Sequence, residues 1–97
     1  MLDKMRQLME MKRQADLIKK DLDQTSTEVN EMRGIKIKIS GSQQFQSIEI
    51  DEALLNAGNK ASLESDLLLS LNAAVKQSQN LAAQKMKAMM PPGFPTG

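Results

Sequence analysis

The stretch Gly34–Asp51, GIKIKISGSQQFQSIEID, decides the fold of this chain of 97 residues. Isoleucine alternates with lysine at its start, a Gly/Ser/Gln segment follows, and isoleucine then returns at every second position. Alternation of this kind on both sides of a turn segment predicts a β-hairpin with one buried face. The register that keeps the isoleucines on that face pairs Ile37 with Ile50, Lys38 with Glu49 and Ile39 with Ile48, and it places Gln43 and Gln44 at the turn.

The segments on both sides of the hairpin have a helical period instead. Residues 2–22 carry apolar side chains at three- and four-residue spacing, and residues 63–90 do the same. This spacing predicts two long amphipathic helices. Ser62 is placed to cap the second helix, and Pro91 and Pro92 are placed to end it.

Two shorter segments connect these elements. Residues 25–30 alternate β-branched and polar side chains, which predicts an edge strand that Gly34 separates from the hairpin. Residues 52–61 form a connector, in which Asp51 is placed to cap a short turn and Gly58 to end it.

The predicted fold class is therefore α+β, with a long N-terminal helix, a three-stranded antiparallel meander and a long C-terminal helix. Residues 1–90 form one domain, and residues 91–97, PPGFPTG, form a Pro/Gly-rich tail. A helix of about 28 residues is about 42 Å long, whereas a strand of about six residues spans roughly 20 Å. The second helix must extend past the sheet, and its apolar stripe favours a homodimer over exposure to water.

Composition argues against an enzyme. The chain has no His and no Cys, which removes the usual zinc sites, the Ser and Cys triads and disulfides. Glu49, Asp51 and Glu52 lie near one another but lack a further converging ligand, so we expect no metal, no cofactor and no small-molecule substrate. No segment approaches the roughly 18 to 20 apolar residues of a membrane span, so we expect a cytoplasmic protein without a membrane partner.

Charge is unevenly distributed, although the net charge is only +1. Residues 1–20 contain more basic than acidic side chains, and no acidic residue follows Asp66. Basic helices can contact phosphates, but basic residues near a helix C-terminus also complement the helix dipole. Lys36 and Lys38 are expected to face Glu49 and Asp51 across the hairpin instead. The candidate DNA-binding residues are Lys4, Arg6, Lys12 and Arg13 in the first helix and Lys76, Lys85 and Lys87 in the second.

Three features together resemble one known family. They are the order helix, three strands, helix; the run from Ile48 to Asp51 with Leu54 and Leu55 after it; and the segment 91–94, Pro-Pro-Gly-Phe. In these features the chain resembles the YbaB/EbfC family of bacterial nucleoid-associated DNA-binding proteins. The resemblance implies a tweezer-like homodimer in the cytoplasm and nucleoid, whose projecting helices contact double-stranded DNA and which acts in nucleoid organisation and gene regulation.

The chain departs from the family pattern at Glu52, where the family has proline, and in a second helix that is poorer in charge. Fewer basic residues release fewer counterions, which implies weaker DNA binding. An alternative is a prefoldin-like helix-and-hairpin scaffold, a chaperone that binds unfolded protein. That alternative requires apolar surface near the helix ends, for which the candidates are Met86, Met89, Met90 and Phe94.

Overall fold

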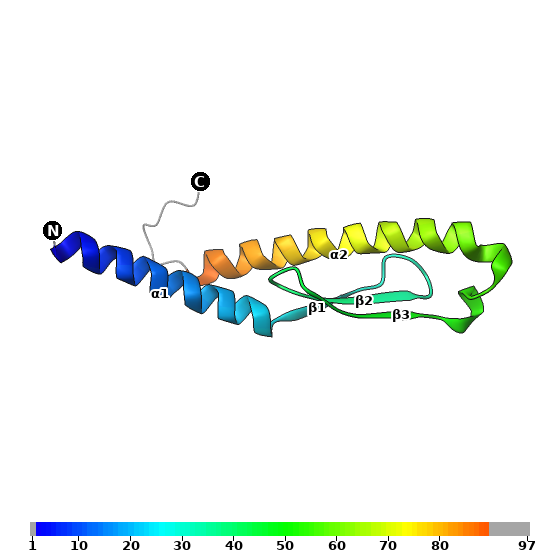
Figure 1. The fold of residues 1–97 in the computed structure, drawn as a ribbon, viewed down its shortest axis with the longest axis horizontal. Helices are drawn as coiled ribbons and strands as arrows, with labels where there is room; N and C mark the ends of the chain where they lie inside the picture. The colour runs from blue at the N-terminus through cyan, green and yellow to red at the C-terminus, as the bar shows by residue number, and fades with distance from the viewer. Residues whose placement is uncertain (1, 90–97) are drawn as a thin grey trace.

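A computed structural model, which describes residues 2–89, shows an elongated molecule with extents of 67 × 21 × 17 Å (Figure 1). It confirms the α+β fold class: along the chain, one long helix precedes the antiparallel meander and another follows it. The predicted tail, and the predicted helix stop at Pro91 and Pro92, lie outside the described residues. The elements are α1 (Leu2–Gln24), β1 (Ser26–Val29), β2 (Ile35–Ser40), β3 (Phe45–Ile50), the 3-10 turns η1 (Glu52–Leu54) and η2 (Ala57–Asn59), and α2 (Lys60–Met89).

The connector before α2 follows the prediction only in part. The Asp51 carboxylate accepts a hydrogen bond of 3.1 Å from the backbone N–H of Ala53, so its role as a cap is confirmed. Gly58 lies inside η2 rather than at the end of a turn. The capping role expected of Ser62 is wrong, because α2 already begins at Lys60 and Ser62 lies within its first turn.

The hairpin register differs from the predicted one by two residues. Ile50 lies opposite Ile35 rather than Ile37, and the whole of β3 is shifted in the same sense. The cause is a turn that lies earlier in the chain than predicted, at residues 41–43. Gln43 adopts a left-handed conformation with φ of 66°, and the N–H of Ser40 donates to the carbonyl of Gln44, which is already past the turn, at 2.9 Å. The observed pairs are Ile35–Ile50, Lys36–Glu49, Ile37–Ile48, Lys38–Ser47 and Ile39–Phe45, with an irregularity between Lys38 and Ile39.

The shift by two residues preserves the faces of the sheet, because side chains alternate with a period of two. Ile35, Ile37 and Ile39 are buried as predicted, and Lys36 and Lys38 are exposed on the other face. The strand order is β1-β2-β3, so β1 is an edge strand, as expected, and β3 is the other edge.

Helix α2 covers the apolar face of the sheet over β1 and β2 (Figure 1). The core consists of Val29 and the three isoleucines of β2 against Ala74 of α2. Ser70 and Ser78 lie one turn to either side of Ala74 and are completely buried. Small side chains at four-residue spacing let the helix axis approach the sheet closely.

Strand β3 is left uncovered by this arrangement. Phe45 and Ile48 belong to the same face as the buried isoleucines, yet each is 46% exposed. The side of α2 next to β3 is also apolar. We call this surface the β3 flank; it consists of Phe45 and Ile48 of β3 and of Leu68, Leu71 and Val75 of α2.

The helical period places the α2 members of the β3 flank on the side away from β1. Gln77 marks the β1 side, because its side-chain amide donates to the hydroxyl of Thr27 and to the carbonyl of Glu28. Leu68 and Val75 lie roughly half a helical turn around from Gln77, at about 100° per residue. The apolar stripe therefore continues sideways from β3 rather than ending at the core.

Candidate nucleic-acid interface

The C-terminal end of α1 is fixed to the hairpin turn by Gly41. The Gly41 N–H lies 3.1 Å from the carbonyl oxygen of Leu22 and 2.9 Å from that of Thr25. A Cβ at position 41 would lie 2.9 Å from Cδ2 of Leu22, so only glycine fits without displacing that side chain. This contact, together with the burial of Leu22, sets the direction in which α1 leaves the sheet.

The N-terminal half of α1 extends past the end of α2 (Figure 1). Gln14 and Ile18 are half-buried against the rest of the chain, whereas the apolar side chains nearer the N-terminus are exposed. Leu2, Met5, Leu8 and Met9 are each more than 60% exposed. This half of α1 is therefore a projecting arm.

The predicted basic residues of α1 are all exposed on this helix. Lys12 and Arg13 line one shallow depression together with Lys20, which was not among the predicted contacts. Its spacing from Lys12 and Arg13, eight and seven residues, is the helical signal that could have identified it. Asp16 lies among the three cations, and Lys4 and Arg6 lie nearer the N-terminal end.

The three predicted contacts on α2 are not equivalent. Lys76 lies midway along the helix and Lys87 lies in its last turn, and both are exposed. Lys85, in contrast, is half-buried, and its Nζ lies 3.4 Å from Oδ2 of Asp21 on α1. The structure thus pairs one of the candidate cations with an acidic residue.

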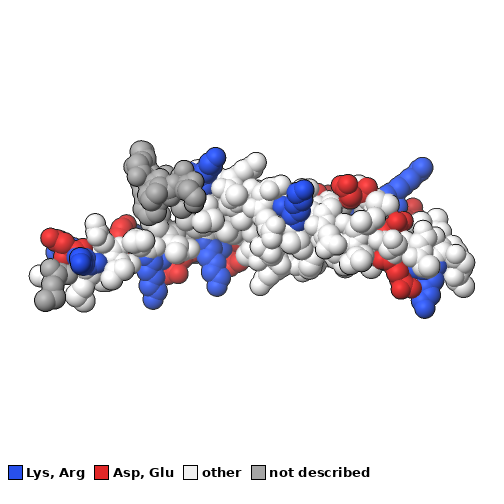
Figure 2. Space-filling model, turned by 90° about the horizontal axis from the view of Figure 1, so that it is seen from above, with Lys and Arg blue, Asp and Glu red and all other residues white. Residues whose placement is uncertain are grey.

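The basic residues do not gather into one patch. Figure 2 shows Lys and Arg spaced along the whole length of the molecule, with Asp and Glu between them. Lys76 lies above the sheet, apart from the cluster formed by Lys12, Arg13 and Lys20. Lys12, Arg13 and Lys20 thus lie together on one face of α1, whereas Lys76 lies apart from them.

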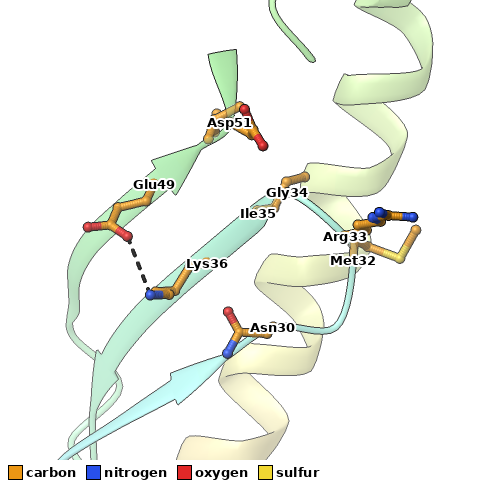
Figure 3. A pocket seen from close by; sticks show the side chains of 9 residues that line it. Asn30, Met32, Arg33, Gly34, Ile35, Lys36, Glu49 and Asp51 are labelled. Atoms are coloured by element: carbon orange, nitrogen blue, oxygen red, sulfur yellow. Dashed lines mark ion pairs between the residues drawn. The ribbon is translucent and has the colours of Figure 1, made fainter. Parts of the chain in front are cut away.

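A second depression, of about 470 Å³, lies at the opposite end of the sheet near the β1–β2 loop. Figure 3 shows Lys36 and Glu49 pointing toward each other across the hairpin, at an Nζ to Oε2 distance of 3.7 Å. The predicted pairing of Lys36 with a hairpin carboxylate is thus confirmed. Lys38 lies opposite Ser47 and Glu28, so the expected partners Glu49 and Asp51 are wrong for this residue.

The chemistry of this depression does not favour one ligand class. Arg33 and Lys36 are balanced by Glu49 and Asp51, and all four side chains are exposed. Within residues 2–89, no three acidic side chains converge as a metal site would require. Neither of the two described helices is long and apolar enough to cross a membrane.

The model of the YbaB/EbfC DNA-binding family matches residues 1–94. The fold is similar to the crystal structure of the uncharacterized protein HP0035 from Helicobacter pylori, with a TM-score of 0.74 and 18% sequence identity. The similarity covers 87% of this chain and 89% of that one. A comparison with curated protein sequences gives no match.

Proposed function

Because the chain belongs to the YbaB/EbfC DNA-binding family, we propose that it is a bacterial nucleoid-associated protein that binds double-stranded DNA as a homodimer. The observation that carries the proposal is helix α1, whose N-terminal half projects and on which Lys12, Arg13 and Lys20 share one exposed face. A basic helix face that does not pack on the sheet can lie along a DNA backbone without any rearrangement of the core.

Binding is proposed to use phosphates rather than base edges. Phosphate contacts position a protein on a duplex but carry no sequence information. The chain has only two aromatic residues, so it offers no platform on which unpaired bases could stack. The basic residues are also dispersed along the molecule, which suits contacts with successive phosphates of a long duplex (Figure 2). The protein would thus bind with little sequence preference and contribute to nucleoid organisation and gene regulation, as a binding protein without catalysis.

The β3 flank supports the homodimer. Phe45 and Ile48 lie on the core side of the sheet, yet the described part of the chain leaves both of them exposed. A second copy related by a two-fold axis would cover both flanks with the same residues, since an isologous interface is self-complementary. Such a dimer presents two α1 arms, which doubles the number of phosphates within reach.

The proposal is tested by gel retardation of random and defined duplexes over a range of salt concentrations. We expect retardation of both duplexes at low salt, with similar affinities. We also expect log K to fall linearly with log salt concentration, by about 0.9 for each phosphate contacted. Absence of retardation at low salt would contradict the proposal.

A second candidate is the prefoldin-like scaffold that holds unfolded protein. The exposed Leu2, Met5, Leu8 and Met9 favour it, because they place apolar surface on a projecting helix. Met86 is 40% exposed and Met89 is half-buried, whereas Met90 and Phe94 lie outside the described residues. Suppression of the aggregation of an unfolded client, without DNA retardation, would favour this candidate.

A further inference from the structure

Asp21 and Lys85 form the ion pair that joins α1 to α2 within residues 2–89. Both side chains are 38% exposed, which makes them the least exposed partners of the three ion pairs in this part of the chain. The other two pairs join Lys36 to Glu49 within the hairpin and Lys60 to Glu64 within α2.

The position of Asp21 is fixed by helix packing. Ile18, three residues before Asp21, and Leu22, one residue after it, lie on the side of α1 that meets the rest of the chain. Ile18 is half-buried and Leu22 is buried. The carboxylate is therefore held beside Lys85, where the C-terminal part of α1 lies against α2.

The geometry points to Asp21 as a positioning residue that withdraws Lys85 from DNA and so limits the affinity of the α1 and α2 surface for phosphates. This inference rests on the proposed DNA binding. A phosphate that approaches the Lys85 ammonium meets a carboxylate 3.4 Å from it, and the pair has no net charge. A lysine held by a carboxylate neutralises no DNA phosphate and so displaces no counterion from the DNA, and Lys85 therefore adds little to the salt dependence of binding.

The two exposed lysines of α2 differ from Lys85 in this respect. Neither Lys76 nor Lys87 has an acidic partner within 4 Å among the described residues. In the described part of the chain, no carboxylate competes with phosphate for them, whereas Lys85 becomes available to phosphate only when the Asp21 carboxylate is removed.

The experiment measures the slope of log K against log salt for duplex binding by variants of the full chain. Asp21→Asn keeps the shape of the side chain and removes its charge. We expect it to raise affinity and to steepen the slope by up to about 0.9 for each protomer. Asp23→Asn is the matched control, because Asp23 is exposed on the same last turns of α1 and forms no ion pair among the described residues. It removes an equal charge without freeing a lysine and is expected to change the slope far less.

Lys85→Ala is measured both in the wild-type protein and together with Asp21→Asn. In the wild-type protein Lys85→Ala should leave the slope nearly unchanged, whereas Lys76→Ala should lower the slope. Combined with Asp21→Asn, Lys85→Ala should return the slope to the wild-type value. Asp21→Glu preserves the charge and should behave as wild type, and circular dichroism of each variant verifies that the helices are retained.

Three results would overturn the inference. Equal slopes for Asp21→Asn and Asp23→Asn would show that pairing with Asp21 does not restrain Lys85. A loss of slope in Lys85→Ala as large as that in Lys76→Ala would show that Lys85 already contacts DNA. Failure of the wild-type protein to retard any duplex would remove the proposed function as well, so the two failures are distinguishable.

Discussion

The hydroxyl of Ser78 in α2 donates a hydrogen bond of 2.7 Å to the carbonyl oxygen of Ser40 at the end of β2, and both residues are fully or almost fully buried. This bond ties the middle of the long helix to the strand that precedes the hairpin turn. It also gives a partner to the buried hydroxyl at this core position of α2, since a buried polar group without a hydrogen bond is costly.

We expect Ser78→Ala to lower the free energy of unfolding by about 0.5 to 1.5 kcal/mol, the usual net value of one hydrogen bond. Urea denaturation at a single protein concentration measures the change, because the stability of a dimer depends on concentration. Ser70→Ala is the matched control. Ser70 is equally buried, but its hydroxyl bonds only to the Asp66 carbonyl of its own helix. A loss at Ser70 as large as the loss at Ser78 would contradict the assigned role of the helix-to-strand bond.

We expect Gly41→Ala to destabilise the protein by about 1 to 3 kcal/mol, because overpacking has this typical cost. The added Cβ would lie 3.2 Å from the backbone oxygen of Leu22 as well as close to its side chain, and the backbone cannot move independently of α1. Gly58→Ala is the control, since the nearest atom to a Cβ there is 3.5 Å away. It should change the stability by less than about 1 kcal/mol in either direction. Thermal unfolding followed by circular dichroism compares the two variants.

We expect Ile48→Asp to convert the protein to monomers. A charge in the middle of the β3 flank would have to be desolvated at the proposed dimer interface, which is strongly unfavourable. Ser47→Asp places the same charge on the neighbouring residue of β3, which is exposed and faces Lys38 on the other side of the sheet. Sedimentation velocity should give the mass of one chain for Ile48→Asp and of two chains for wild type and Ser47→Asp. If Ile48→Asp remains dimeric, the interface lies elsewhere.

The elements of this fold were predictable because they depend on local periodicity. A period of two in β2 and a period near 3.6 in both helices are visible without knowledge of any distant contact. The register was not predictable in the same way. Phe45, Gln46 and Ser47 do not alternate, so the pattern gave no sign that β3 begins at Phe45. The turn was expected at Gln43 and Gln44, whereas it lies slightly earlier, at residues 41–43.

The candidate interface was predictable only as a set of exposed basic residues. Lys85 was expected to be equivalent to Lys87, but its partner Asp21 belongs to the other helix, and only the tertiary structure brings the two together. Conversely, Lys20 carried a usable signal, because it recurs at helical spacing from Lys12 and Arg13. Charge on a helix face can be read from the sequence, whereas neutralisation across helices depends on packing.

The last prediction concerns the basic cluster on α1. Replacing Lys12, Arg13 and Lys20 with Ala should leave the fold intact, because exposed side chains on a helix usually contribute less than about 0.5 kcal/mol to stability. If all three side chains contact phosphate in both protomers, the slope of log K against log salt should fall by up to roughly 5. Gel retardation on a random duplex measures the effect.

The matched control removes three cations from the opposite end of the molecule, through Arg33→Ala, Lys36→Ala and Lys60→Ala. Lys36 and Lys60 already have acidic partners, Glu49 and Glu64, so their contribution to phosphate binding is expected to be small. Both triple variants change the net charge equally, which separates a local contact from a general effect of charge. A loss of slope of the same size in both would show that DNA is bound through the overall charge of the protein rather than through the basic cluster on α1.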